Sequence, residues 1–157
     1  MPPYLNPSII VAYDEHDTII WYTKRGQINK MKINKPYCVV SVEDDQMIYE
    51  LIQATLRTLP IDLHHAVNGT QALTLIPELQ PDVVILDINL PGMHGWEVLK
   101  ELMAQQMSFR GVIVLTAQTS ATHRVIAHLQ DTVTHFIGKP FDPFELRKAV
   151  QQVLDLT

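Results

Sequence analysis

The stretch "VVILDINLPGMHGW", residues 83–96, decides the fold of this chain. Its four consecutive aliphatic residues predict a strand that is buried on both faces, and such strands are typical of parallel sheets. The run ends on a carboxylate, Asp87, and a Pro-Gly turn follows it. Taken alone, Asp87 is most simply a residue that caps the end of the strand. The rest of the chain must therefore show which groups the fold places beside Asp87.

Short apolar runs alternate with helical patterns from residue 37 to the end of the chain. Asn68 and Asp142 have the character of N-caps, and Pro143 suits the first helical position. Pro77 should end or kink the helix that begins after Asn68. Five strand–helix units in strict alternation predict a parallel sheet with helices on both faces. The expected strands are residues 38–42, 61–67, 82–87, 111–117 and 134–138, and a helix is expected near residues 119–130.

The first 35 residues differ from the rest in charge and in pattern. They carry a net charge of +2, whereas the remainder of the chain carries −7. The β-prone runs "SIIVAY" (8–13) and "TIIWYT" (18–23) predict a hairpin, and a Lys-rich stretch without a clear pattern follows. We expect an N-terminal extension over residues 1–35, either hairpin or flexible tail, and a main domain over 36–157. The apolar residues 19–22 raise the alternative of dimerisation or partner docking.

Composition restricts the class of protein. Of the 157 residues 46% are hydrophobic and 18% charged, as in soluble globular proteins. A lone cysteine, Cys38, excludes an internal disulfide and a Cys-based zinc site. There is neither an apolar run of membrane-spanning length nor a signal-peptide pattern, so a cytoplasmic location is expected. The acidic main domain argues against direct binding of nucleic acid.

Polar and charged residues stand where four of the five expected strands end. The carboxyl ends of parallel strands meet at one edge of the sheet, where ligands bind in such folds. Crowded carboxylates repel one another, and an oxygen-only set of ligands suits Mg²⁺ better than zinc. A lysine and a hydroxyl beside them suit phosphoryl oxygens, and an aspartate can accept a phosphoryl group covalently. These residues are Glu43, Asp44, Asp45, Asp87, Thr116 and Lys139.

Four blocks of sequence resemble the receiver domains of two-component response regulators, which have a flavodoxin-like fold. The resemblance runs from residue 37 to the C-terminus and implies a sheet of order 2-1-3-4-5. The blocks have that family's order and spacing, and the four together are highly specific. They are "VVSVEDD" (39–45), "PDVVILDINLPGMHGWEVL" (81–99), "VIVLTA" (112–117) and "FIGKPFDPFEL" (136–146).

The resemblance assigns the metal-binding and phosphoacceptor positions. It makes Asp87 the phosphoacceptor. It makes Glu43 and Asp44 the acidic pair that holds Mg²⁺, with Asp44 the more direct ligand. Asn89 matches the position whose backbone carbonyl completes the metal shell. Glu43 stands where aspartate is commoner, which lengthens one carboxylate but keeps its charge.

The resemblance also assigns the residues that respond to the phosphoryl group. Thr116 matches the hydroxyl that moves toward it, and Lys139 matches the lysine that contacts it. The peptide bond between Lys139 and Pro140 is expected to be cis. Phe136 matches the aromatic switch that turns inward with Thr116, although it lacks the hydroxyl of the commoner tyrosine. The Gly-Ala that usually precedes the switch is replaced within "QDTVTHF" (130–136), so we expect a less sharply turned loop into the fifth strand and a different geometry of the output face.

The leading hypothesis is a single-domain phosphorylation switch. It would accept a phosphoryl group from a histidine kinase or a histidine phosphotransfer protein and signal to a downstream protein target, without being a turnover enzyme. A phosphorelay intermediate fits equally well. Because the sequence ends at the fifth expected helix, no output domain is expected. The alternatives are a phosphorylation-independent protein-interaction module with a receiver fold and an aspartate-nucleophile phosphatase, which would need an acid where Asn89 stands. A homodimer is a further option.

Overall fold

The computed structural model describes residues 11–13, 18–22, 27–32, 35–117 and 132–156. The chain divides into two compact units, Met1–Pro36 and Tyr37–Thr157. The helix expected near residues 119–130 lies outside the described residues. In the described ranges, no helix is both long enough and apolar enough to cross a membrane.

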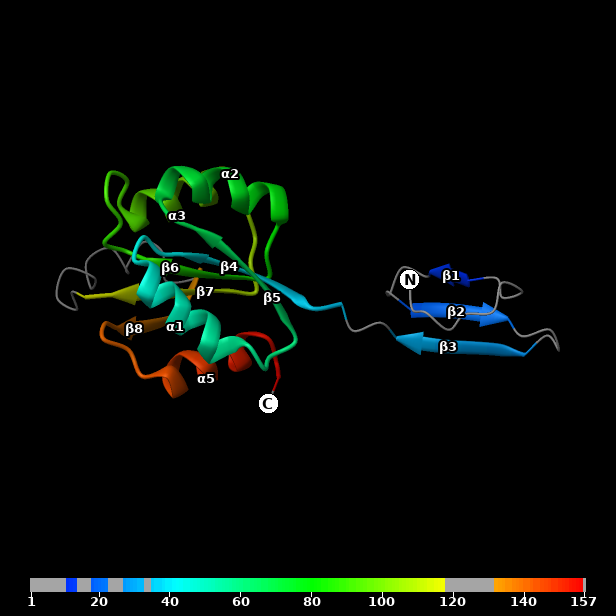
Figure 1. The fold of residues 1–157 in the computed structure, drawn as a ribbon. Helices are drawn as coiled ribbons and strands as arrows, with labels where there is room; N and C mark the ends of the chain where they lie inside the picture. Colours follow the sequence, from blue (N-terminus) through cyan, green and yellow to red (C-terminus); the bar gives the residue numbers. More distant parts are fainter. Residues whose placement is uncertain (1–10, 14–17, 23–26, 33–34, 118–131, 157) are drawn as a thin grey trace. The chain divides into compact units, whose positions relative to one another are not determined.

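The first unit contains a three-stranded antiparallel sheet of order β1-β2-β3 (Figure 1). Strands β1 (Val11–Tyr13) and β2 (Thr18–Tyr22) come from the two runs for which a hairpin was predicted. Strand β3 (Ile28–Lys32) falls in the Lys-rich stretch, for which no strand was predicted. Backbone pairing with β2 outweighs the weak strand propensity of that stretch, because propensity in a strand depends strongly on its neighbours.

The second unit is built on five parallel strands in the order β5-β4-β6-β7-β8. This is the predicted order 2-1-3-4-5, so the predicted flavodoxin-like fold is confirmed. The register pairs Val42 with Leu86, Asp87 with Leu115 and Thr116 with Gly138, so the carboxyl ends of four strands align at one edge. The strands are β4 (Tyr37–Val42), β5 (Ile61–Ala66), β6 (Val83–Asp87), β7 (Gly111–Thr116) and β8 (Val133–Gly138).

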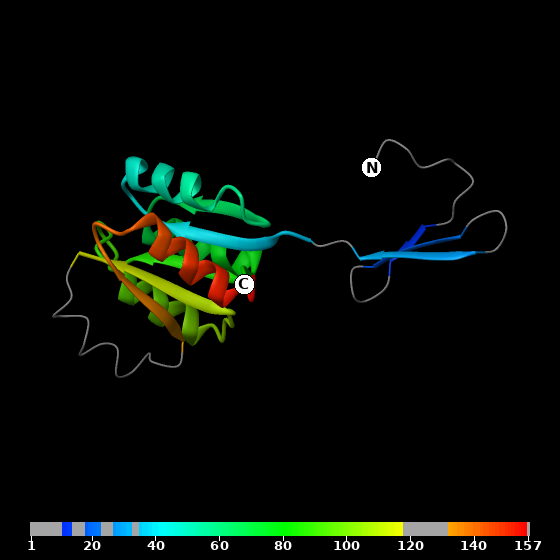
Figure 2. The ribbon, with the colours of Figure 1, turned by 90° about the horizontal axis from the view of Figure 1, so that it is seen from below.

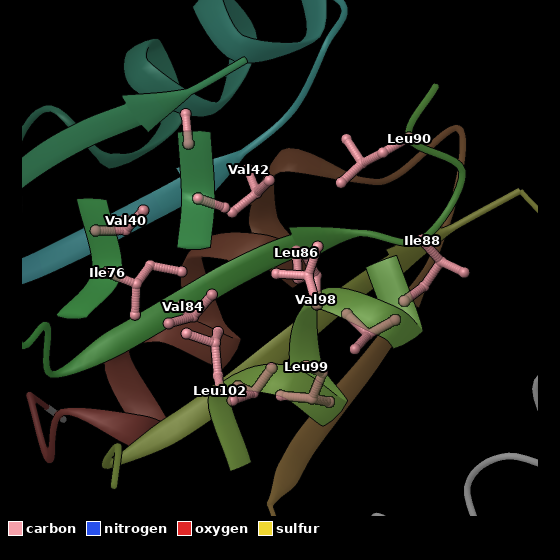
Figure 3. Close-up of a cluster of buried hydrophobic side chains, with 14 of the residues drawn as sticks. Val40, Val42, Ile76, Val84, Leu86, Ile88, Leu90, Val98, Leu99 and Leu102 are labelled. Carbon is pink, nitrogen blue, oxygen red and sulfur yellow. The ribbon is translucent and has the colours of Figure 1, made fainter. Parts of the chain in front are cut away.

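Helices cover both faces of this sheet (Figures 1 and 2). Helices α2 (Gly69–Leu79) and α3 (Gly95–Ala104) pack on one face, where their buried side chains meet those of the central strands (Figure 3). Helices α1 (Gln46–Leu56) and α5 (Pro143–Val153) pack on the other face. The central strand β6 is buried along its whole length, which explains the four consecutive apolar residues that precede Asp87.

The helix starts follow the predicted capping. The Asn68 side chain accepts a hydrogen bond from the Gln71 amide (2.8 Å), and the Asp142 side chain accepts one from the Phe144 amide (2.8 Å). Helix α2 does not end at Pro77 but continues to Leu79. Proline removes one backbone hydrogen bond, and the packing of the buried turn before it outweighs that loss.

Candidate functional site

Three charged side chains from distant parts of the chain meet at the carboxyl edge of the sheet. The Lys139 Nζ donates hydrogen bonds to Glu43 Oε2 (2.7 Å) and to Asp87 Oδ2 (2.8 Å). Lys139 is 96 residues from Glu43 and 52 from Asp87 in the sequence. The parallel topology places them together because each follows or ends a strand of the same sheet. The predicted convergence of these residues is therefore present.

The cluster is buried, which makes its charges costly and mutually dependent. The exposed fractions of the side chains are 13% for Lys139, 1% for Glu43 and 4% for Asp87. Buried charges are tolerated when they are paired and hydrogen-bonded, as these are. Two carboxylates nevertheless face one ammonium, so the group keeps a surplus of negative charge.

The pKa values of Glu43 and Lys139 are both raised, that of Glu43 by burial and that of Lys139 by its pairing with carboxylates. Burial raises the pKa of Glu43, and the hydrogen bond from Lys139 only partly opposes this. Burial would lower the pKa of Lys139, but the hydrogen bonds that Lys139 donates to Asp87 and Glu43 outweigh it, and the pKa of Lys139 is raised. Lys139 is thus a firmly protonated cation at neutral pH.

A third carboxylate completes a possible metal site. Glu43, Asp44 and Asp87 can each place one carboxylate oxygen within 4.8 Å of the others. Asp44 is exposed, whereas the other two are buried, so the site has an open side. Oxygen-only ligands with one side open to water are the donor set that Mg²⁺ prefers. The residues therefore fit this ion.

Asp45 has a different task from its neighbours. Its Oδ1 accepts hydrogen bonds from the amides of Met47 (2.8 Å) and Ile48 (3.2 Å), so it caps helix α1. Its own amide donates to Glu43 Oε1 (3.1 Å). Asp45 thus stabilises the loop and the start of α1.

The remaining predicted residues lie around the cluster. The Asn89 amide donates to Asp87 Oδ1 (2.9 Å), and the Lys139 amide donates to the carbonyl of buried Thr116 (2.8 Å). The peptide bond between Lys139 and Pro140 is cis, as expected. Phe136 is 37% exposed, and its ring centroid lies 6.3 Å from that of Trp96 on α3. The carbonyl of Asn89 as a metal ligand, and Phe136 as a switch, stay predictions.

Two residues beside the site were missed by the sequence analysis. A Cβ on Gly95 would lie 2.4 Å from the Asp87 carbonyl oxygen, so only glycine lets α3 start against this strand end. A glycine directly before the apolar pattern of a helix was the available signal. His65 Nε2 lies 2.7 Å from the Glu43 carbonyl oxygen, a contact between neighbouring strands that no local pattern indicates.

The family model for the response regulator receiver domain matches residues 39–151 of this chain. The chain belongs to the response regulator receiver family. Sporulation initiation phosphotransferase F of Bacillus subtilis (strain 168) is 34% identical to it over 118 residues, which are 75% of this chain and 94% of that protein. The DNA-binding response regulator MtrA of Mycobacterium tuberculosis (strain ATCC 25618 / H37Rv) is 40% identical over 108 residues.

Solved receiver domains have the same fold as this one. The receiver domain of the Francisella response regulator 1452 aligns with a TM-score of 0.68 and 29% identity, over 76% of this chain and 98% of that one. The Vibrio cholerae chemotaxis protein CheY4 aligns with a TM-score of 0.66 and 30% identity, over 74% and 98%. The MtrA alignment covers 69% of this chain and 46% of MtrA. This chain therefore spans about half the length of MtrA.

Family membership gives the acidic cluster a chemical meaning. Receiver domains of response regulators are phosphoacceptors in two-component signalling and generally bind Mg²⁺ at an acidic pocket. This receiver domain has such a cluster in Glu43, Asp44 and Asp87.

Proposed function

We propose that Asp87 accepts a phosphoryl group from the phosphohistidine of a histidine kinase or a histidine phosphotransfer protein. The observation that carries this proposal is the pair of hydrogen bonds from Lys139 to Glu43 and Asp87 at the carboxyl edge of the sheet. It places a carboxylate nucleophile, a cation for phosphoryl oxygens and a metal-side carboxylate within one buried cluster. Positioning and charge neutralisation are most of what phosphoryl transfer requires from a protein.

The chemistry follows from these contacts. A carboxylate oxygen of Asp87 attacks phosphorus, a new O–P bond forms, and the N–P bond breaks with its electron pair left on the donor's imidazole. The Lys139 ammonium, hydrogen-bonded to Asp87 before transfer, then binds a phosphoryl oxygen as well. Glu43, Asp44, Asp87 and the Asn89 carbonyl would hold Mg²⁺, which would supply further positive charge for the phosphoryl oxygens. The protein thereby promotes its own phosphorylation without being a turnover enzyme.

The signal is proposed to leave through Thr116 and Phe136. Thr116 ends β7, and the neighbouring strand β8 carries Phe136 opposite Val114, two residues before the pairing of Thr116 with Gly138. A phosphoryl group on Asp87 attracts the Thr116 hydroxyl, and the space that it leaves admits the partly exposed Phe136 ring. A downstream protein in the cytoplasm would bind the resulting surface.

The domain boundary supports this assignment. We propose that residues 36–157 are the receiver domain and that residues 1–35 are an extension with a role of its own. The family match begins at residue 39, and the antiparallel strands of the first unit lie before it. Homodimerisation through the extension is one candidate role.

The experiment that tests the function is intact mass after incubation with acetyl phosphate and Mg²⁺. Wild type should gain one phosphoryl mass, and Asp87→Asn should gain none. Asp82→Asn is the matched control, because Asp82 precedes the other end of the same strand and should leave phosphorylation intact. Addition of EDTA should prevent the gain. Phosphorylation of Asp87→Asn, or a wild type that accepts nothing from acetyl phosphate or a phosphohistidine protein, would contradict the proposal.

A further inference from the structure

His65 connects the edge strand β5 to the loop that carries Glu43 and Asp44. Its Nε2 lies 2.7 Å from the Glu43 carbonyl oxygen, and because a carbonyl can only accept, Nε2 is the donor. The Glu43 amide donates to the Ala66 carbonyl at 3.0 Å. Both backbone polar groups of Glu43 are therefore held by neighbouring residues of β5.

The His65 ring is also fixed from its face. It stacks on the Tyr49 ring with 3.6 Å between centroids and 5° between planes. Tyr49 lies in the first turn of α1, and its amide donates to the Asp45 carbonyl at 3.0 Å. The imidazole is thus held between the helix that follows the acidic loop and the backbone at the loop's start.

The bonded carbonyl belongs to the peptide unit that joins Glu43 to Asp44. A peptide unit is planar, so a hydrogen bond to its oxygen also fixes the orientation of the Asp44 amide. The direction in which the Asp44 side chain leaves the backbone depends on that orientation. The oxygens of the three carboxylates lie within 4.8 Å of one another. This arrangement therefore depends on the hydrogen bond from His65 to the Glu43 carbonyl, in which no carboxylate takes part.

We propose that His65 is a positioning residue for the Mg²⁺ site of this receiver. Its hydrogen bond to the Glu43 carbonyl holds Glu43 and Asp44 in the arrangement that binds a divalent cation. The inference rests on the proposed function, since it concerns the metal on which phosphorylation of Asp87 depends. Some residues do not bind a metal themselves but hydrogen-bond to its ligands. Removal of such a residue typically weakens metal binding by about 10- to 100-fold.

Two substitutions separate the hydrogen bond from the ring. His65→Phe keeps an aromatic ring that can stack on Tyr49 but has no donor. His65→Gln loses the ring but places an amide N–H near the position of Nε2. His64→Phe is the matched control, because His64 is adjacent, points to the opposite face of β5 and contacts Asp62 instead.

The measurements are the Mg²⁺ dissociation constant by calorimetry and the Mg²⁺ dependence of phosphorylation by acetyl phosphate, both on the full chain. His65→Phe should bind Mg²⁺ about tenfold more weakly. Its phosphorylation rate should recover at saturating Mg²⁺, which a merely structural defect would not allow. His65→Gln and His64→Phe should stay within about twofold of wild type, the conservative variant thus rescuing the affinity.

The outcomes distinguish this inference from the proposed function. Wild-type Mg²⁺ affinity in His65→Phe would overturn the role of His65 while leaving phosphorylation of Asp87 intact. Equal weakening in His65→Phe and His65→Gln, together with a lowered unfolding temperature in both, would also overturn it in favour of simple packing. If wild type itself neither binds Mg²⁺ nor becomes phosphorylated, the proposed function fails first.

Discussion

Each end of the parallel sheet has a cation paired with carboxylate, and the two pairs differ in burial and in charge balance. At the carboxyl end, Lys139 contacts Glu43 and Asp87 at 2.7 and 2.8 Å, with every side chain at most 13% exposed. At the amino end, the Arg110 Nε lies 3.3 Å from Asp82 Oδ1, with side chains 49% and 33% exposed. One cation faces two carboxylates at the first end and a single carboxylate at the second.

The amino-end pair uses its hydrogen-bonding capacity to join the strand starts. Asp82 Oδ2 accepts from the Cys38 amide (2.9 Å), and the Asp82 carbonyl accepts from the Arg110 amide (2.8 Å). The Arg110 guanidinium also lies 5.3 Å from the centroid of the Tyr37 ring. This end is balanced in charge, whereas the carboxyl end keeps a surplus that a cation can neutralise. Charge balance, more than the presence of an ion pair, separates a binding site from a structural contact.

The largest contrast is expected from removing each cation. Lys139→Met leaves two buried carboxylates without a counter-charge and should lower the free energy of unfolding by about 3 kcal/mol. Arg110→Met removes a half-exposed partner and should cost less than about 1 kcal/mol. Urea denaturation in EDTA measures both.

Addition of Mg²⁺ is a second test of the role of Lys139 in stability. Millimolar Mg²⁺ should restore part of the lost stability in Lys139→Met, because the ion replaces the missing positive charge. It should stabilise Arg110→Met only as much as it stabilises wild type, because that variant keeps the metal site intact. Equal losses in the two variants, or the same response to Mg²⁺, would remove the distinction between the two ends.

A smaller contrast is expected from adding one methyl group at each end. Gly95→Ala places a Cβ 2.4 Å from the backbone oxygen of Asp87, which cannot yield easily, and should cost about 2 kcal/mol. In Gly111→Ala the Cβ meets side-chain atoms of Thr134 (2.6 Å) and Val153 (2.8 Å), and the Thr134 hydroxyl would lose its hydrogen bond to the Val112 carbonyl (3.1 Å) if it moved. These atoms belong to side chains and not to the backbone, so that change should cost about 1 kcal/mol, less than Gly95→Ala.

Phosphorylation separates the two glycine variants further. Gly95→Ala should slow phosphorylation by acetyl phosphate, because Asp87 must shift with its backbone, and Gly111→Ala should not. Urea denaturation and intact mass report the two effects. If Gly95→Ala were as stable and as reactive as wild type, the close approach of α3 to this strand end would have no consequence.

The smallest effect concerns the pH dependence of Mg²⁺ binding, because protonation of Glu43 removes part of the surplus negative charge of the cluster. Burial raises the pKa of Glu43 above its ordinary value of 4.5, although Lys139 opposes this. A carboxyl group with a raised pKa is protonated earlier as pH falls, and Mg²⁺ must displace that proton. Mg²⁺ affinity should therefore decline from a pH above 4.5, by about tenfold per pH unit once Glu43 is protonated.

Calorimetry at several pH values, from about 7.5 down to about 5, measures this decline. Glu43→Gln is the control, since it should bind Mg²⁺ more weakly at high pH but lose the part of the decline that Glu43 causes. Affinity in wild type that holds constant down to the range where an ordinary glutamate titrates would contradict the raised pKa.

Much of the carboxyl end could be predicted because one topological rule fixes it. Strictly alternating strands and helices imply a parallel sheet, and a parallel sheet gathers the residues that follow its strands. Glu43, Asp87 and Lys139 could thus be placed together although 96 residues separate the first from the last. The order of the strands needed the resemblance to a known family, because alternation alone allows several orders.

Contacts that depend on register or packing could not be predicted in the same way. Asp45 stands with the other acids in the sequence, and only its hydrogen bonds to the start of α1 show that it is a cap. The contact of His65 with Glu43 requires the pairing of β4 with β5 in one particular register. Strand β3 and the continuation of α2 past Pro77 likewise depend on neighbours that local patterns do not contain.

The reach of Lys139 across the sequence also bears on protein synthesis. A nascent chain on the ribosome acquires Asp87 long before it acquires Lys139, which lies 52 residues later. Until the last strand docks, the two carboxylates have no ammonium between them, and closing such a long loop is a late and slow event in folding. The cluster of Lys139, Glu43 and Asp87 on which the proposed phosphoryl transfer depends would therefore be assembled last, once strand β8 has docked.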